Sequence, residues 1–340
     1  MLEALSFEDV LLVPQYSDIE SRLQVDISNK LSEGLVLELP VISSPMDTVT
    51  ESEMAATMQN CGGLGIVHRY NTIEEQVSLI RGATMLGAKN VGAAVGVTGD
   101  YEERACALYD AGARIICVDV AHGHHALMKT ALTSLRGVFG NDVHIMAGNV
   151  ATREGFEMLA TWGADSVRVG IGGGSICSTR LVSGHGVPTF QSILDCAESS
   201  FDTKIIADGG IRSSGDIVKA YAAGADFVMV GSVLAGAKET PGEVFSKASG
   251  KKYKVYRGMA SSSAQEAWRG KSSTPEGVST TILYKGKAKN ILENLRGGIR
   301  SGFSYSGCRS FSEFQAKAKF IKQTNAGQVE SGTHILRGKV

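Results

Sequence analysis

The sequence predicts a (β/α)8 barrel, that is, a closed TIM barrel of parallel strands surrounded by helices. Eight short apolar segments recur along the 340 residues, and a glycine or polar turn and then a helical pattern follow each of them. Segments that are apolar throughout are typical of parallel strands buried on both faces. Strands that alternate with helices favour a parallel sheet, and eight units at nearly regular spacing favour its closure into a barrel.

The predicted elements follow one another without an interruption that would mark a linker or an appended module. The expected strands are 39–45, 63–68, 90–96, 114–120, 144–150, 166–172, 204–210 and 227–232. Amphipathic helical patterns lie at 74–86, 102–112, 124–139, 153–163 and 215–224. Three of these helices lead into the next strand through a glycine followed by alanine, which is typical of a helix that ends at glycine. We therefore expect one domain over 1–340.

Composition excludes several classes of protein. With 43% hydrophobic residues, 20% charged residues and a net charge of −1, the chain resembles an ordinary globular protein without a surface for nucleic acid or anionic membranes. The six cysteines show no CxxC or CxxH spacing, which predicts reduced thiols. The first residues lack the basic start of a signal peptide, and no apolar stretch is long enough to span a bilayer. We expect a cytoplasmic protein that binds any anionic ligand locally.

Polar and unusual residues gather where the predicted strands end. In a barrel, the carboxyl ends of the strands form one rim and carry the functional site. The residues at these ends are Met46-Asp47, His68-Arg69, Asp119, Asn149, the segment 170–177, Asp208-Gly209-Gly210 and Gly231-Ser232. The sequence therefore places its candidate site on one rim.

The segment VGIGGGSICSTR (169–180) holds four glycines around a cysteine just after a predicted strand. Backbone N–H groups in such a loop can converge on phosphate oxygens, although the same composition also suits a flexible surface turn. Two later glycine turns, at 207–216 and 229–236, fit the phosphate site that barrels place after their last strands. Together the three loops favour phosphate binding.

Cys177 differs from the other cysteines because it lies within the glycine loop, near Arg180. A thiolate there could be stabilised and could attack a ligand, which makes Cys177 a candidate nucleophile. A free cysteine is otherwise a small buried hydrophobic residue. We expect that simpler role for Cys61, Cys106, Cys117 and Cys196.

Asp208 stands at a strand end before two glycines, where a carboxylate can accept hydrogen bonds from two ribose hydroxyls. A helical pattern follows closely, so an N-cap role for Asp208 is the alternative. Three histidines, His122, His124 and His125, have no carboxylate or cysteine at metal-binding spacing, and we expect no metal site there.

Six motifs, GIGGGSICSTR, ADGGIR, SSPMDTVTE, DVAHGH, AGNV and YRGM, together resemble the IMP dehydrogenase/GMP reductase family. The resemblance runs from 6–14 to 297–307 and so covers nearly the whole chain. It implies a (β/α)8 barrel, assembled as a homotetramer, that binds a purine nucleotide beside a nicotinamide cofactor. It also implies a thioimidate intermediate, formed when Cys177 attacks C2 of the purine, and hydride transfer between that carbon and the nicotinamide.

The same resemblance assigns the residues around each part of the ligands. The 5′-phosphate would lie among Ser175, Gly210, Gly231, Ser232 and Tyr256, and the ribose hydroxyls on Asp208. Met46, Gly258, Met259 and Ala260 would frame the base; Asp119, Val120, Asn149 and Gly170 would line the nicotinamide side; and Thr179 would lie near the reacting carbon.

Family members also bind a monovalent cation, typically potassium, through carbonyls of the cysteine loop. By resemblance those carbonyls belong to Gly172, Gly174 and Cys177. Gly173 departs from the family pattern, in which a proline is common at this place.

Several features favour the reductase, which converts GMP to IMP and ammonia with NADPH. The chain lacks the regulatory insert that dehydrogenases usually carry after the second helix, and it has Val120 where dehydrogenases typically have a hydroxyl residue. The flap, about 260–285, is short and lacks the Arg-Tyr pair that activates the hydrolytic water in dehydrogenases. In a reductase a flap carboxylate assists the loop threonine, and here these residues would be Glu276 and Thr179.

Other features favour the sibling reaction, in which IMP dehydrogenase oxidises IMP to XMP with NAD. The segments SSPMDTVTE, RLVSGHGVP and AGQVESGTH are more similar to dehydrogenases than to reductases. A third hypothesis is a nucleotide-binding protein that has kept the phosphate site but lost turnover, motivated by Gly173 and the unusual flap. We expect GMP reductase.

Overall fold

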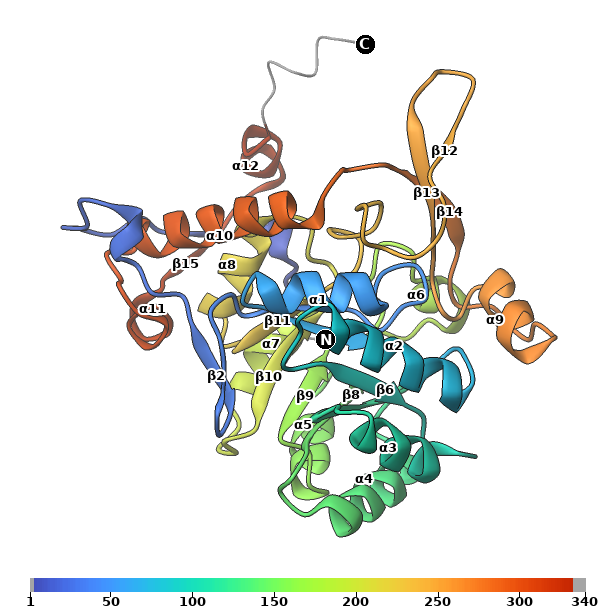
Figure 1. Ribbon diagram of the computed structural model, residues 1–340. Coiled ribbons are helices and arrows are strands. Elements are labelled where there is room, and N and C mark those ends of the chain that lie inside the picture. The colour runs from blue at the N-terminus through green and yellow to red at the C-terminus, as the bar shows by residue number, and fades with distance from the viewer. Residues whose placement is uncertain (1–2, 333–340) are drawn as a thin grey trace.

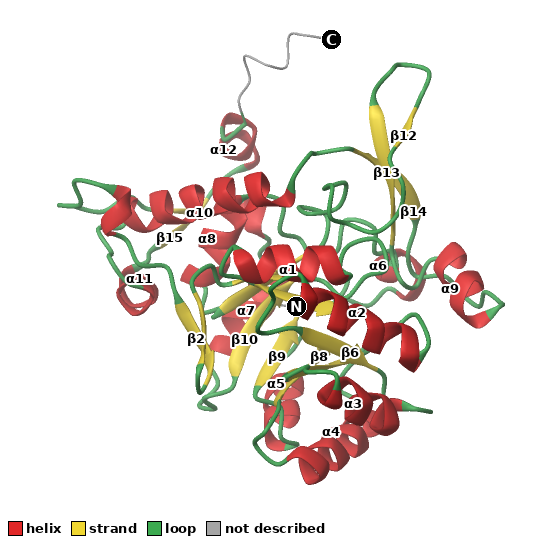
Figure 2. Ribbon diagram, viewed as in Figure 1, coloured by secondary structure: helices red, strands yellow, loops and turns green. Residues whose placement is uncertain are grey.

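The computed structural model describes residues 3–332 and confirms the predicted barrel. Eight parallel strands close on themselves in chain order, since the last of them pairs with the first. The strands form the centre of the molecule and the helices surround them (Figures 1 and 2). The strands are β4 (Val41–Ser43), β5 (Leu64–Val67), β6 (Gly92–Val95), β7 (Ile115–Asp119), β8 (His144–Val150), β9 (Ser166–Val169), β10 (Lys204–Asp208) and β11 (Phe227–Val230).

All eight predicted strands form, each within or equal to its expected range, because the flanking glycines and polar residues belong to the turns. The barrel helices are α1 (Ser52–Asn60), α2 (Ile73–Met85), α3 (Tyr101–Asp110), α4 (Ala126–Phe139), α5 (Arg153–Thr161), α6 (Thr179–Ser183), α7 (Thr189–Ala197), α8 (Ser214–Ala222) and α10 (Ala288–Tyr305). As expected, α3, α5 and α8 lead into glycines with positive φ, namely Gly112, Gly163 and Gly224. No helix of residues 3–332 is long and apolar enough to cross a membrane.

The barrel is filled by side chains and closed at its amino-terminal end. The inward-facing apolar residues of the strands, among them Ile66, Met146 and Phe227, form one buried cluster. The hairpin of β2 (Asn29–Ser32) and β3 (Leu35–Leu37) adds three leucines to the same cluster. The barrel is therefore a packed core, and only its carboxyl-terminal rim remains open for a site.

A second sheet lies beyond the barrel rim, and its strands come between β11 and α10 in the chain. It consists of β12 (Phe245–Ser246), β13 (Lys252–Arg257) and β14 (Ser279–Leu283), and it extends away from the barrel (Figure 1). The segment between β13 and β14 contains α9 (Ser262–Arg269) and corresponds to most of the predicted flap. The remaining elements pack outside the barrel: η1 (Phe7–Asp9), β1 (Val10–Leu12), η2 (Arg22–Gln24), α11 (Phe311–Lys317), β15 (Phe320–Lys322) and α12 (Asn325–Glu330).

One expectation from the sequence requires correction, and one alternative is excluded. Cys61, Cys117 and Cys196 are buried as predicted, but Cys106 is exposed because the buried face of α3 carries Ala105 and Leu108 instead. The alternative role of Asp208 as an N-cap is excluded, because Ser213 caps α8 through its side chain. The last two residues of the AGQVESGTH segment lie outside the described residues.

The packing of α1 on β5 depends on a glycine. A Cβ built on Gly65 would lie 2.5 Å from the Cα of Ala55. We expect Gly65→Ala to lower the free energy of unfolding by about 1–3 kcal/mol, since overpacking forces the helix away from the strand. Gly137→Ala is the matched control, because its Cβ would meet nothing within 4 Å on an exposed turn of α4. That variant should be stabilised by about 0.5–1 kcal/mol. Urea unfolding measures the stability of both variants. Equal free energies of unfolding for Gly65→Ala and Gly137→Ala would contradict the packing argument.

Candidate active site

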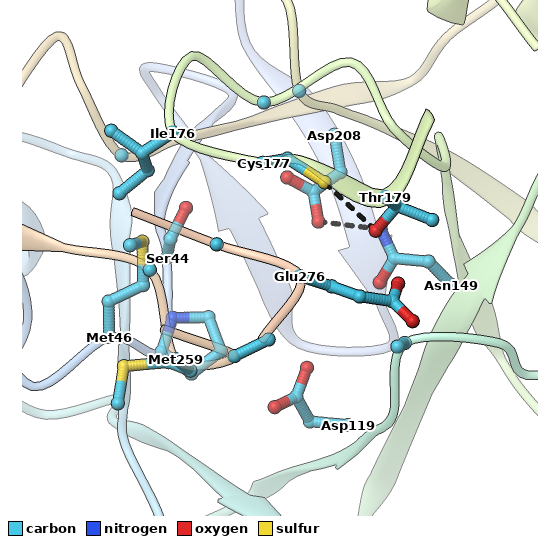
Figure 3. A pocket seen from close by; sticks show the side chains of 18 of the residues that line it. Ser44, Met46, Asp119, Asn149, Ile176, Cys177, Thr179, Asp208, Met259 and Glu276 are labelled. Atoms are coloured by element: carbon cyan, nitrogen blue, oxygen red, sulfur yellow. Dashed lines mark hydrogen bonds between the residues drawn. The ribbon is translucent and has the colours of Figure 1, made fainter. Parts of the chain in front are cut away.

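A cavity of about 560 Å³ opens at the carboxyl ends of the barrel strands, beneath the flap. Its lining comes from the strand ends, the cysteine loop and the flap, so segments distant in the sequence meet here (Figure 3). All the residues that the resemblance assigned to a ligand or to catalysis line this cavity: Met46, Asp119, Val120, Asn149, Gly170, Gly172, Gly174, Ser175, Cys177, Thr179, Asp208, Gly210, Gly231, Ser232, Tyr256, Gly258, Met259, Ala260 and Glu276.

The cysteine loop connects β9 to α6 and presents an exposed thiol to the cavity. Sγ of Cys177 lies 3.2 Å from the hydroxyl oxygen of Thr179, to which it donates a hydrogen bond. The expected contact with Arg180 does not occur, because Nη2 of that side chain donates to the carbonyl of Val187 at 2.9 Å. Thr179, and not Arg180, is the side chain that contacts the candidate nucleophile.

Close backbone approaches fix the shape of this loop. Gly170 has a φ of +146°, and a Cβ there would lie 1.9 Å from the carbonyl oxygen of Asp208. At Gly173 a Cβ would lie 2.4 Å from Oγ1 of Thr189, the first residue of α7. The place where the family commonly has proline is therefore filled here by the threonine hydroxyl, which gives the departure at Gly173 a steric explanation.

The flap returns to the cysteine loop at Glu276. The backbone N–H of Ser178 donates to the carbonyl of Glu276 at 2.9 Å, and Cys177 forms a β-bridge with Gly277. The Glu276 side chain extends into the hollow that Cys177, Thr179 and Asp119 also face (Figure 3). A carboxylate is thus held beside the candidate nucleophile by backbone contacts.

Asp208 belongs to a polar network that the sequence did not reveal. Oδ2 of its carboxylate accepts from the Asn149 amide at 2.9 Å and from Arg168 Nη2 at 2.8 Å (Figure 3 shows the first). Arg168 also donates to Asp119, so one guanidinium joins two aspartates. The sequence signal for this network was a single arginine inside an otherwise uncharged strand.

Another part of the cavity lining consists of hydroxyl groups and glycines. The Tyr256 hydroxyl lies 3.3 Å from the position of a Cβ built on Gly231. Burial raises the pKa of Tyr256 to about 12, so its hydroxyl stays a neutral donor. Nζ of Lys285 donates to the carbonyls of Ser232 (2.7 Å) and Val233 (3.0 Å), which holds this turn in place. The arrangement suits an anion bound by backbone N–H and hydroxyl donors.

The residues expected around the base lie at the root of the flap. The backbone N–H of Asp47 is 3.4 Å from Sδ of Met259, which brings the turn after β4 to the flap. Arg257 on β13 forms an ion pair with the Asp47 carboxylate, and its Nη1 donates to the carbonyl of Ser263. The two strand ends that carry Met46 and Met259 are thereby fixed together.

The tip of the flap rests on the turn after β5. The Trp268 ring packs edge-on against Tyr70 with centroids 5.2 Å apart, and the Arg69 guanidinium carbon lies 5.8 Å from the centroid of Trp268. These aromatic and cationic contacts hold α9 over the cavity next to Asp119. These contacts could not be predicted from a local pattern, because Tyr70 and Trp268 are 198 positions apart.

The three carbonyls that the resemblance assigns to a monovalent cation lie in the cysteine loop, and one of them already accepts a hydrogen bond. The Gly174 carbonyl accepts from the backbone N–H of Cys177 at 3.1 Å, which leaves it one further lone pair. Among residues 3–332, no group of three or more His, Cys, Asp or Glu side chains is placed to hold a metal ion.

Comparison with known proteins agrees with this geometry. The sequence profile described as "IMP dehydrogenase / GMP reductase domain" matches residues 4–334. Inosine-5′-monophosphate dehydrogenase of Nitrosopumilus maritimus is 34% identical, over 98% of both chains. GMP reductase of Leishmania major is also 34% identical, over 98% of this chain and 97% of its own length.

A solved structure shares the whole architecture. It is a cysteine-to-alanine variant of GMP reductase from Trypanosoma brucei in complex with guanosine 5′-monophosphate. It superposes with a TM-score of 0.93 at 32% identity, over 98% of each chain. The profile, the relatives and the barrel with its cysteine loop agree: the chain belongs to the IMP dehydrogenase/GMP reductase family, whose members are NAD(P)-dependent purine nucleotide oxidoreductases.

Proposed function

We propose that this enzyme is a GMP reductase, which converts GMP, NADPH and two protons to IMP, NADP⁺ and ammonium. The observation that carries the proposal is Glu276, a flap carboxylate held at the cysteine loop by the Ser178 N–H and the Gly277 bridge. Reduction of GMP requires that the 2-amino group leave as ammonia. A carboxyl group beside Thr179 and Cys177 is the kind of group that can deliver the proton.

In this mechanism Sγ of Cys177 attacks C2 of GMP, and a carbon–sulfur bond forms. Glu276 and Thr179 protonate the 2-amino group, and the carbon–nitrogen bond breaks. Ammonia departs, and a thioimidate between C2 and Cys177 remains. When bound, the reduced nicotinamide supplies a hydride to C2. The carbon–sulfur bond then breaks, and Cys177 recovers its electron pair as IMP forms. The covalent step divides one difficult substitution into two easier ones.

The lining of the cavity fits both ligands. Ser175, Gly210, Gly231, Ser232 and Tyr256 would hold the phosphate, and Asp208 the ribose. Met46, Gly258 and Met259 would frame the purine base. Asp119, Val120, Asn149 and Gly170, which also line the cavity, would lie on the nicotinamide side.

IMP dehydrogenase is the second candidate, and the relatives support it, because several of them carry that name. A dehydrogenase must activate water to hydrolyse the thioimidate to XMP. The flap has no Arg-Tyr pair for that task, and Arg269 follows Trp268 instead. This difference is our reason to prefer the reductase.

A paired assay decides between the two reactions. Purified enzyme receives GMP with NADPH in one cuvette and IMP with NAD and potassium in the other, and the absorbance of the reduced nicotinamide is followed. We expect absorbance to fall in the first and to stay constant in the second. A rise in the second alone would make the enzyme a dehydrogenase. A mass shift on Cys177 during turnover would exclude a protein that only binds nucleotide.

We further propose that potassium binds the carbonyls of Gly172, Gly174 and Cys177, and that the enzyme is a homotetramer with a single catalytic domain. The alignment with the Nitrosopumilus maritimus enzyme spans 469 positions, so that relative has residues that this 340-residue chain lacks. Replacement of potassium by sodium in the assay tests the cation, and light scattering tests the assembly.

Asp208→Ala should weaken GMP binding by a free energy on the order of 1–3 kcal/mol, because it removes the acceptor for the ribose hydroxyls. Asp208→Asn keeps the shape of the side chain and should lose less. Calorimetric titration with GMP measures both variants. Affinity unchanged in Asp208→Ala would remove Asp208 from the ribose site.

A further inference from the structure

Arg168 is a buried arginine that lies between the two halves of the cavity. It is the one charged residue of β9, and only 8% of its side chain is exposed. A buried guanidinium is costly unless ion pairs and hydrogen bonds compensate it. Its partners therefore explain why an arginine occupies an otherwise uncharged, fully buried strand.

Those partners come from two different strands. Nε and Nη2 both donate to Oδ2 of Asp208 on β10, at 3.0 and 2.8 Å. Nη1 donates to Oδ1 of Asp119 on β7. Burial alone would lower the pKa of Arg168, but the two carboxylates outweigh it and raise that pKa, so the group stays charged. One planar, fixed cation thus holds two carboxylates.

Each carboxylate keeps its second oxygen for a ligand. Oδ2 of Asp208 is occupied by Arg168 and by the Asn149 amide, whereas no residue of the described chain donates to its Oδ1. Oδ2 of Asp119 is likewise without a donor within hydrogen-bond distance among residues 3–332, and its nearest cation is Arg69 Nε at 3.7 Å. Both carboxylates line the cavity.

We propose that Arg168 is a positioning residue that couples the nucleotide half of the site to the cofactor half. The inference rests on the proposed function only where that function assigns Asp208 to the ribose and Asp119 to the nicotinamide side. A ligand that moves one carboxylate moves the rigid guanidinium, and the guanidinium moves the other carboxylate. Linkage requires that cofactor and nucleotide change each other's affinity by the same factor, and we expect that change to be a gain, because either ligand fixes the guanidinium that positions the carboxylate of the other.

The test is a double-mutant cycle on GMP binding, measured by calorimetry with Asp119→Asn, Arg168→Lys and the double variant. Lysine keeps the charge but replaces the rigid planar fork with a single ammonium on a flexible stem, so it cannot hold the two carboxylates in a fixed relation to each other. Asp119→Asn should weaken GMP binding about threefold or more in the wild-type background, although Asp119 lies outside the ribose site. In the Arg168→Lys background the same substitution should have no further effect. Asp202→Asn is the control, because it removes a fully exposed carboxylate before the start of β10.

A second readout separates coupling from a merely structural role. In the wild type, saturating NADP⁺ should tighten GMP and IMP binding, and in Arg168→Lys this gain should disappear while the thermal unfolding midpoint stays near that of the wild type. Equal effects of Asp119→Asn in both backgrounds, or an intact NADP⁺ effect in Arg168→Lys, would overturn the coupling and leave the proposed function standing. Failure of the wild type to bind either nucleotide would overturn both.

Discussion

Cys177→Ala should abolish turnover, with a loss of at least about 10⁴-fold in kcat. The thiol is exposed to the cavity and donates to Thr179, and the described cavity lining holds no second cysteine that could replace it. GMP affinity should stay within a few-fold, since the phosphate and ribose contacts come from other residues. Steady-state rates and calorimetry on the same preparation measure both quantities.

Cys106→Ala is the matched control for this variant. Cys106 is also exposed, but it lies on the outer face of α3, away from the cavity. It should keep the wild-type rate. Residual turnover above about one hundredth of the wild type in Cys177→Ala would contradict a covalent mechanism.

Glu276→Gln should lower kcat for GMP reduction by about 10²-fold or more, because the amide has the same shape but cannot deliver a proton. Hydride transfer itself should survive. With IMP and NADP⁺, the enzyme thiol and purine C2 form the thioimidate while a hydride passes to NADP⁺ and a proton is released. A rapid-mixing experiment should therefore still show one burst of NADPH per active site.

The control for the flap substitution is Glu266→Gln, an exposed glutamate on α9 that faces away from the cavity. It should change neither the steady-state rate nor the burst. Loss of the burst in Glu276→Gln to the same extent as turnover would show that Glu276 supports the loop and not the deamination. Wild-type GMP turnover in that variant would remove Glu276 from the mechanism.

The barrel could be predicted from the sequence because each strand is a local pattern. The run IICV in β7 is apolar at every position, and a strand buried on both faces accounts for such a run between two helical patterns. The rim residues followed from the same logic, since Asp119, Asn149 and Asp208 each end or nearly end their strands. The roles of these residues came from resemblance and stay predictions.

The contacts between distant segments could not be predicted in this way. Arg168 pairs with carboxylates 49 and 40 positions away, and no local pattern encodes such a distance. The same holds for Trp268 on Tyr70. Lys285, which holds the turn at Ser232, resembled an ordinary surface lysine in the sequence. Such contacts depend on the assembled barrel, which brings the ends of several strands and the flap together at one rim.

The flap is attached to the barrel at three separate places, and this has an evolutionary consequence. Its root is fixed by the Asp47–Arg257 ion pair, α9 touches the barrel through Trp268, and Glu276 and Gly277 bind the cysteine loop through backbone contacts. The stretch between these attachments can exchange residues or change length without disturbing a single barrel strand. Selection can therefore redirect the chemistry of such an enzyme by rewriting one surface segment, while the scaffold that holds the nucleotide is inherited unchanged.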